Sequence, residues 1–269
     1  MDHSNFRKLV LKDHCLFRSV NILNYNEPIQ DHFLPGTGKI YFTFYYGSAI
    51  KLVESDKRVT PEKLVVEPVA KSSKLSCSDN LKIIKLELNP QRWFQITKIK
   101  AKDCNSKDFD ISIILGHAVV NDLHTKFKDL ENPGDVIQIL DRDLGNNYNK
   151  WTQSTAIDKI IFYIFQKKGK ISIAEIINKF NLSKSSLYNY FNIYIGVSPK
   201  FYIRLVNFNR TLVKCLNGDK SLAEIIREDN YHDYSHFQKD FEQFTGTKIS
   251  KISSLDNPML RIMLQNTNI

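Results

Sequence analysis

A repeated segment dominates the C-terminal half of this 269-residue chain. The sequence SIAEII at residues 172–177 recurs 49 residues later as SLAEII at residues 221–226. Both copies place Ser-x-x-Glu before an apolar run, which is the pattern of a capping box. In that motif the Ser hydroxyl accepts a hydrogen bond from the fourth residue's amide, and the Glu carboxylate accepts one from the Ser amide. Each copy therefore predicts the start of a short amphipathic helix.

A turn and a second helix are predicted after each copy. Asn181 and Asn230 follow the short helices, and because Asn tolerates positive φ, both positions favour a tight turn. The second helices are expected at about residues 184–195 and 234–245. Their apolar anchors are Leu187, Phe191, Phe237 and Phe241. Short helix, turn and second helix is the helix-turn-helix pattern, whose second helix can enter the DNA major groove.

A long helix is predicted between the two units. Ser198 suits the N-cap and Pro199 the first helical position, and apolar residues recur at helical spacing until Gly218 ends the pattern. Gly196 and Gly246 end the second helices in the same way. If the long helix holds the second helices about one turn of DNA apart, roughly 34 Å, they can enter successive major grooves.

Helical geometry selects the side chains that would face DNA. With Leu187 and Phe237 inward and about 100° per residue, one outward face appears on each second helix, and two side chains flank the N-terminal tip of the later helix. The candidate DNA-binding residues are Ser185, Tyr188, Asn189, Asn192, Tyr234, Ser235, His236 and Lys239. Asn can pair with adenine and Lys with guanine, while hydroxyl groups suit bases or phosphates. An ordinary solvated face is the alternative for any one residue.

The charge distribution favours double-stranded DNA as a partner. Residues 151–255 carry 15 Lys and Arg against 9 Asp and Glu, whereas residues 1–150 carry 22 against 19. The formal net charge of +9 alone would fit many proteins. Its concentration in the repeat-bearing segment is more informative, because it agrees with the repeats and the turns.

The N-terminal half is predicted to form a sheet followed by helices. Up to about residue 95, short apolar segments such as 39–46, 64–66 and 81–88 alternate with turn signals, which predicts a small β-barrel or sandwich. Helices are expected at 111–120, 123–127 and 135–140. The Asn-rich stretch 141–149 indicates an interdomain linker.

The predicted fold class is α+β. It combines an N-terminal small β-barrel or sandwich, with helices, and a C-terminal all-α domain of two helix-turn-helix units joined by a long helix. The predicted boundaries are a sensor or dimerisation domain at 1–140, a linker at 141–153, a DNA-binding domain at 154–256 and a tail at 257–269.

No catalytic or metal centre is indicated in the N-terminal half. Its His residues lack metal-ligand spacing, and Gly-rich phosphate loops and nucleophile elbows are absent from the sequence, so neither an enzyme nor a cofactor is expected. His32, His117 and His124 are interpreted as surface or core-edge residues. Three aromatic residues either line a small-molecule pocket or belong to the core, and the core is favoured. These are Tyr41, Tyr45 and Trp93.

The cysteines and the N-terminus indicate a cytoplasmic protein. The four cysteines lie far apart without a C-x-x-C pair, which fits reduced thiols. They are Cys15, Cys77, Cys104 and Cys215. Residues 1–8 lack an apolar signal core, and no run reaches the roughly 18 apolar residues of a membrane span. Association with a membrane is therefore not expected.

The segment from about Thr155 to Leu255 resembles the DNA-binding domain of AraC/XylS-type transcription regulators. The match includes the two capping boxes, Gly196 to Pro199, and the segment from Ser235 to Phe237. It implies a sequence-specific regulator whose two units contact DNA bases. The positions that it implies are Ser185, Tyr188, Asn189, Tyr234, Ser235, His236 and Lys239, close to those that geometry selects.

The N-terminal half is more weakly similar to the cupin-like sensor domains of such regulators. That similarity rests on Pro35-Gly36 before an aromatic strand and on residues 86–90 before Trp93 and Phe94. It implies a small-molecule effector, a homodimer, or both. RNA polymerase is a further expected partner.

Two departures from the family pattern support an alternative function. Asp229 stands where an apolar residue is normal, and Lys248-Ile249 stands where Ser-Pro is normal. A charge at a semi-buried position costs free energy unless it is paired. The alternative is an interaction protein with a degenerate second unit that acts through a protein partner.

Overall fold

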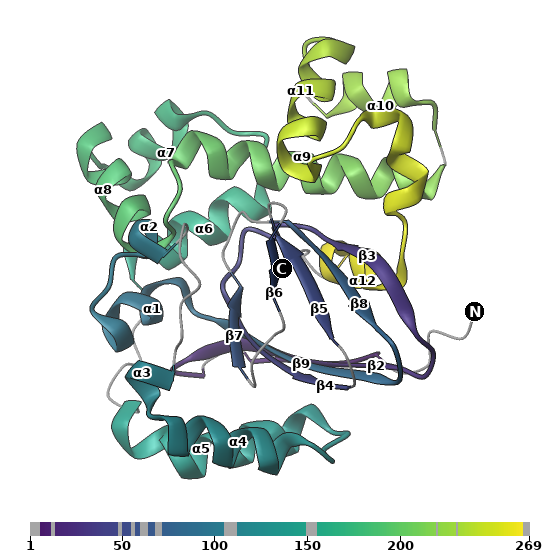
Figure 1. Ribbon diagram of the computed structural model, residues 1–269. Coiled ribbons are helices and arrows are strands. Elements are labelled where there is room, and N and C mark those ends of the chain that lie inside the picture. Colours follow the sequence, from purple (N-terminus) through teal and green to yellow (C-terminus); the bar gives the residue numbers. More distant parts are fainter. Residues whose placement is uncertain are drawn as a thin grey trace.

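The N-terminal half forms two antiparallel sheets that lie face to face (Figure 1). The computed structural model describes residues 6–265 apart from 12–13, 48–49, 55–56, 60–63, 68–71, 105–111, 149–154, 219 and 230. The five-stranded sheet has the order β1 (Phe6–Val10), β2 (Phe17–Tyr25), β9 (Leu81–Leu88), β4 (Tyr41–Tyr46) and β7 (Leu64–Glu67). The four-stranded sheet has the order β3 (Ile29–Leu34), β8 (Ser73–Cys77), β5 (Lys51–Glu54) and β6 (Lys57–Val59).

Strand β9 shows how alternation distributes side chains between two cores. Ile84 and Leu86 join the core that the helices share, whereas Ile83 packs with residues of the second sheet. Lys85 and Glu87 lie on the same face as Ile83, because residues two apart on a strand point the same way. Both are buried. This face of the five-stranded sheet is therefore partly polar.

Five helices follow the sheets. They are α1 (Pro90–Thr97), α2 (Ala101–Cys104), α3 (Ser112–Leu115), α4 (His117–Phe127) and α5 (Pro133–Tyr148). Helices α3 and α4 are separate because Gly116, with φ of 88°, interrupts them. Phe127 of α4 packs edge-on against Phe44 of β4 at a ring-centroid distance of 5.1 Å, so α4 covers the outer face of the five-stranded sheet.

Two sequence-based boundaries need correction. Strand character was expected up to about residue 95, but α1 begins at Pro90, where the proline occupies the first turn of the helix. The linker was expected at 141–153, but residues 141–148 continue α5, whose buried Leu140 and Leu144 anchor the helix. The rest of that linker lies outside the described residues.

The C-terminal half is helical among its described residues, which confirms the predicted fold class. Its elements are α6 (Ala156–Gln166), α7 (Ile173–Phe180), α8 (Lys184–Tyr194), α9 (Pro199–Asn217), α10 (Leu222–Glu228), α11 (Tyr234–Thr245), the 3-10 helix η1 (Ile249–Leu255) and α12 (Pro258–Gln265). Figure 1 shows α7 and α8 on one side of α9 and α10 and α11 on the other. No helix in the described part of the chain is long and apolar enough to cross a membrane.

Helix α12 lies where a tail was expected. It contacts β3 and α9. Asn257 Nδ2 donates to the carbonyl of Phe33 at 3.1 Å, and Arg261 NH2 donates to the carbonyl of Leu216 at 3.0 Å. The end of the chain thus returns from the helical half to the sheets.

Candidate nucleic-acid interface

The first helix-turn-helix unit is built as its sequence predicts. Ser172 N donates to Glu175 Oε2 at 2.7 Å, and Glu175 N donates to Ser172 Oγ at 3.2 Å, so the capping box at the start of α7 is complete. The hydrogen bonds from Ser172 lower the pKa of the Glu175 carboxyl. Asn181 ends α7 with φ of 49°. Ser183 then caps α8 through the amide of Ser186 at 3.0 Å.

The second unit repeats this construction. Ser221 N donates to Glu224 Oε2 at 2.9 Å and Glu224 N donates to Ser221 Oγ at 3.4 Å, which forms the capping box of α10. Asp233 caps α11 by accepting from the amide of His236 at 2.7 Å, and Gly246 ends that helix with φ of 68°. The turn predicted at Asn230 lies outside the described residues.

Helix α9 is the common support of both units. Tyr202 packs edge-on against Phe191 of α8 at 5.6 Å between ring centroids. On the other side, Phe208 contacts three aromatic rings of α11 at 5.0–6.1 Å. Arg204 forms an ion pair with Asp240, a buried residue of α11. Both units therefore pack on α9.

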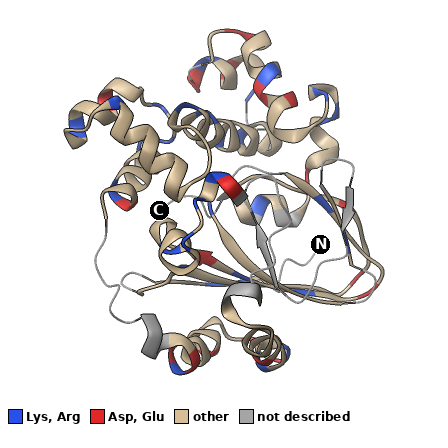
Figure 2. Ribbon diagram, turned by 60° about the vertical axis from the view of Figure 1, so that its left-hand side comes forward, with Lys and Arg blue, Asp and Glu red and all other residues tan. Residues whose placement is uncertain are grey.

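The predicted contact residues lie at the surface of α8 and α11. Ser185, Asn189 and Asn192 are exposed on α8, and Tyr188 is half-buried. The four candidates on α11 are exposed, and they are Tyr234, Ser235, His236 and Lys239. The anchors Leu187, Phe191, Phe237 and Phe241 are fully buried. The outward faces of α8 and α11 are therefore open. Figure 2 shows Lys and Arg, interspersed with Asp and Glu, on the helices of this half.

Asp229 is fully buried and paired. Its carboxylate lies 2.7 Å from Lys214 Nζ, 3.0 Å from Lys170 Nζ and 3.5 Å from Arg210 NH1. Burial alone would raise the pKa of Asp229, but Lys214, Lys170 and Arg210 outweigh it and hold the pKa below its usual value. Sequence reasoning identified the charge but not its partners.

A cleft of about 390 Å³ separates the two units. Its lining includes Lys170, Ser172 and Glu175 from the first unit and its preceding loop, Asn207 from α9, and Tyr231 and His236 from the second unit. The His236 ring packs against Tyr231 at 5.1 Å. His236 thus faces both the cleft and the exposed start of α11.

The N-terminal half contacts the helical half at points that sequence reasoning missed. The Tyr202 hydroxyl donates to the carbonyl of Gly38 at 2.6 Å, and Asn209 Nδ2 donates to the carbonyl of Gly36 at 2.8 Å. Helices α1 and α2 contact α8, with Phe94 edge-on to Tyr194 at 6.0 Å. The Pro35-Gly36 turn signal was visible in the sequence, but its role as a docking point for α9 was not.

The aromatic and His residues noted in the N-terminal half are mainly structural. Tyr45 and Trp93 belong to the core. His32 packs edge-on against Tyr25, His124 stacks on Tyr46, and the exposed His117 contacts Ser112. Among the cysteines whose state is described, Cys15, Cys77 and Cys215 are thiols rather than members of a disulfide.

Charged residues on one face of the five-stranded sheet line a small cavity together with Met263 of α12. Lys39 Nζ lies 3.0 Å from Glu87 Oε2, and Lys85 Nζ lies 4.7 Å from the ring centroid of Tyr41. Burial would raise the pKa of Glu87, but Lys39 and Arg18 lower it overall. The cavity measures about 20 Å³. It is lined by Lys39, Tyr41, Lys85 and Glu87, together with Lys8, Ser19 and Asn21. It is large enough for about one water molecule.

Solved structures with low similarity to this chain include ToxT from Vibrio cholerae and a fungal cupin domain. ToxT from Vibrio cholerae O395, bound to (E)-4-(8-methylnaphthalen-1-yl)but-3-enoic acid, is 12% identical with a TM-score of 0.48, over 88% of this chain and 98% of that one. Unsaturated fatty acid bound ToxT from V. cholerae strain SCE256 is 12% identical with a TM-score of 0.47, over 91% and 98%. The cupin domain of Schizosaccharomyces pombe Cnp3 is 7% identical with a TM-score of 0.27, over 34% and 63%.

Comparison with protein families identifies the C-terminal half. No curated protein matches the chain. The helix-turn-helix domain family matches residues 176–253, which span from α7 of the first unit into η1. The matched segment includes both exposed helices and the long helix between them. The C-terminal part of this chain is therefore a helix-turn-helix DNA-binding domain of the AraC type.

Proposed function

We propose that this protein is a sequence-specific transcription regulator that inserts α8 and α11 into successive major grooves of its operator. The observation that carries the proposal is the pair of helix-turn-helix units packed on one helix, α9, each with an open polar face. Phosphate contacts would supply affinity and base contacts would supply specificity.

The exposed faces suggest how bases would be read. Asn189 on α8 can pair with an adenine edge and Lys239 on α11 with a guanine edge, because these side chains match the donor and acceptor patterns of the major groove. Ser185 and Ser235 suit bases or phosphates. Lys170 and His236 line the cleft between the units, where the DNA backbone between the two grooves would pass.

We propose that the N-terminal half modulates this activity. Gly36 and Gly38 connect the sheets to α9. Helices α1 and α2 connect the N-terminal half to the recognition helix α8. The charged interior, with Lys8, Lys39 and Lys85 around Glu87, favours an anionic effector over a cationic one. The cavity must open to admit it, because small-molecule sites usually measure about 300–1,000 Å³. Homodimerisation and contact with RNA polymerase stay predictions.

The structure weakens the reasoning behind the alternative interaction protein. That hypothesis depended on an uncompensated charge at Asp229, and the charge is paired with three cations. The second departure remains, since Lys248 precedes η1 as its N-cap residue and makes no side-chain capping hydrogen bond. Recovery of a stable protein partner without enriched DNA would favour the alternative.

A crosslinking experiment tests the proposed function. The protein is crosslinked to DNA in its native cells and recovered, and the bound DNA is sequenced. We expect one recurring motif upstream of a limited set of genes. DNA recovered without any shared motif would contradict sequence-specific regulation, and a control variant with Asn189→Ala and Lys239→Ala should lose the motif.

A further inference from the structure

The loop between α6 and α7 reaches across α9 to the second unit. Gly169 in this loop has φ of 70°, and a Cβ added to it would lie 2.5 Å from the backbone nitrogen of Asn207 and 2.7 Å from the carbonyl oxygen of Ile203. Only a residue without a side chain fits at this distance from the backbone of α9. The close approach places the next residue, Lys170, beside Asp229.

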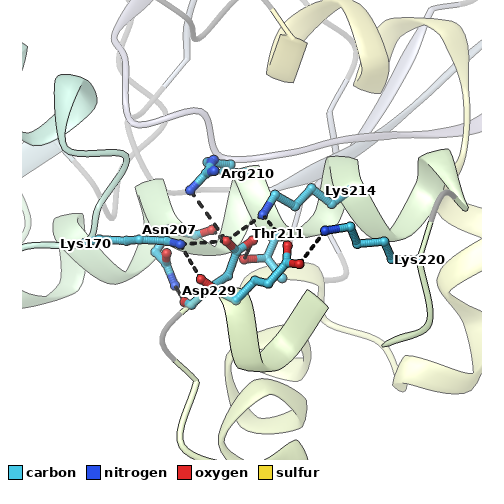
Figure 3. Close-up of polar contacts among 8 residues, drawn as sticks. Lys170, Asn207, Arg210, Thr211, Lys214, Lys220 and Asp229 are labelled. Carbon is cyan, nitrogen blue, oxygen red and sulfur yellow. Dashed lines mark hydrogen bonds and ion pairs between the residues drawn. The ribbon is translucent and has the colours of Figure 1, made fainter. Parts of the chain in front are cut away.

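Lys170 contacts the end of α10 in two ways. Its Nζ atom forms the 3.0 Å ion pair with Asp229 Oδ1 and donates to the carbonyl of Glu228. Lys170 lies just before Ser172, the N-cap of α7. One side chain therefore ties the segment before α7 to the end of α10, and Figure 3 shows Lys170 pointing at Asp229.

The other described partners of Asp229 come from α9. Lys214 and Arg210 supply the remaining positive charges, the Thr211 hydroxyl donates to Asp229 Oδ2 at 3.1 Å, and Asn207 Nδ2 donates to the Asp229 carbonyl at 2.8 Å. These contacts hold the second unit on α9 without reference to the first. Loss of Lys170 should therefore release the link between units and leave the second unit docked.

We propose that the Lys170–Asp229 pair, seated by Gly169, fixes the separation and relative orientation of the two recognition helices and so sets the half-site spacing that the protein accepts. This inference rests on the proposed function. Lys170 and Asp229 act here as positioning residues, because they work through the placement of α8 and α11. A buried and fully paired charge suits this role, since each partner is costly to leave alone.

The test compares binding to operators whose spacing differs. The operator is first selected from random DNA with the unmodified full chain, and then one or two base pairs are inserted or removed between its half-sites. Each base pair shifts one half-site by about 3.4 Å and rotates it by about 35°. The affinity ratio between the selected and altered spacings is measured for the unmodified protein, Lys170→Gln and Lys168→Gln. Lys168 is an exposed residue of the same loop, so its variant controls for the loss of one positive charge.

We expect the unmodified protein to prefer one spacing by about tenfold to a hundredfold, the usual cost of a mismatched site. Lys170→Gln should reduce that preference by about tenfold, in the range of coupling between contacting residues, while Lys168→Gln keeps it. Lys170→Met, which removes the same charge and leaves Asp229 with its partners on α9, replaces Lys170→Gln if that variant does not fold.

The outcomes separate the two proposals. If the unmodified protein enriches no motif, the proposed function fails. If it enriches spaced half-sites but Lys170→Gln keeps the spacing preference, the positioning role is wrong and the function stands. A uniform loss of affinity at every spacing would also overturn the positioning role, because it would indicate that Lys170 only contacts phosphate. The positioning role would also be wrong if the unmodified protein bound operators of every spacing equally well.

Discussion

Replacing Gly169 by Ala should destabilise the helical half more than the same replacement at a second glycine of like conformation. Gly169 and Gly218 have φ of 70° and 74°, so an Ala at either site pays about 1–2 kcal/mol for left-handed backbone. Among the described residues, a Cβ at Gly218 meets nothing within 4 Å, whereas at Gly169 it meets backbone atoms of α9 at 2.5–2.9 Å. Overpacking adds about 1–3 kcal/mol at Gly169 alone.

The assay compares the two variants in the full chain. At about 2–4 °C per kcal/mol for chains of this size, Gly169→Ala should melt roughly 2–12 °C below Gly218→Ala. The midpoints are measured from the loss of helical circular dichroism at equal protein concentration and scan rate. Equal midpoints for the two variants would refute the close approach of the loop to α9.

Three further predictions concern the interface, the buried charge and the contact between the halves. Asn189→Ala and Lys239→Ala should each lose about 1–3 kcal/mol of discrimination at defined base pairs, measured as affinity ratios on single-base operator variants; unchanged ratios in both would refute these assignments. The lowered pKa of Asp229 means that its ionised form stabilises the fold above the unfolded pKa of about 3.9. This stability is lost as pH falls through the lower folded pKa. The thermal unfolding midpoint should therefore fall when the pH is lowered below about 4. It should fall less in Asp229→Asn than in the unmodified protein, and equal decreases would contradict the pairing. Tyr202→Phe removes the hydrogen bond to Gly38 and should cost about 0.5–1.5 kcal/mol in denaturant unfolding; no change would argue against this contact.

Local sequence signals predicted the helical half well. The capping boxes at Ser172 and Ser221, the positive φ at Asn181 and the Ser198-Pro199 start of α9 are all confirmed. Each depends on residues close in sequence, where the chemistry of a helix end leaves few alternatives.

Contacts between distant segments could not be predicted in the same way. Asp229 looked like a defect because its partner Lys170 lies in another unit and the approach depends on Gly169. Lys85 and Glu87 alternate with apolar residues along β9, yet both are buried, Lys85 beside Met263 of α12 and Glu87 beside Lys39. An alternating strand specifies which residues share a face, but not what covers that face.

Selection of binding sites from random double-stranded DNA with the full chain tests the central claim most directly. We predict an enriched motif with two half-sites whose centres lie about 10 base pairs apart. Helices α8 and α11 both pack on α9, and successive major grooves repeat at that interval. Protection of both half-sites should be lost together at high salt, because phosphate contacts supply much of the affinity. Enrichment of a single half-site, or of no motif, would contradict paired reading by the two units.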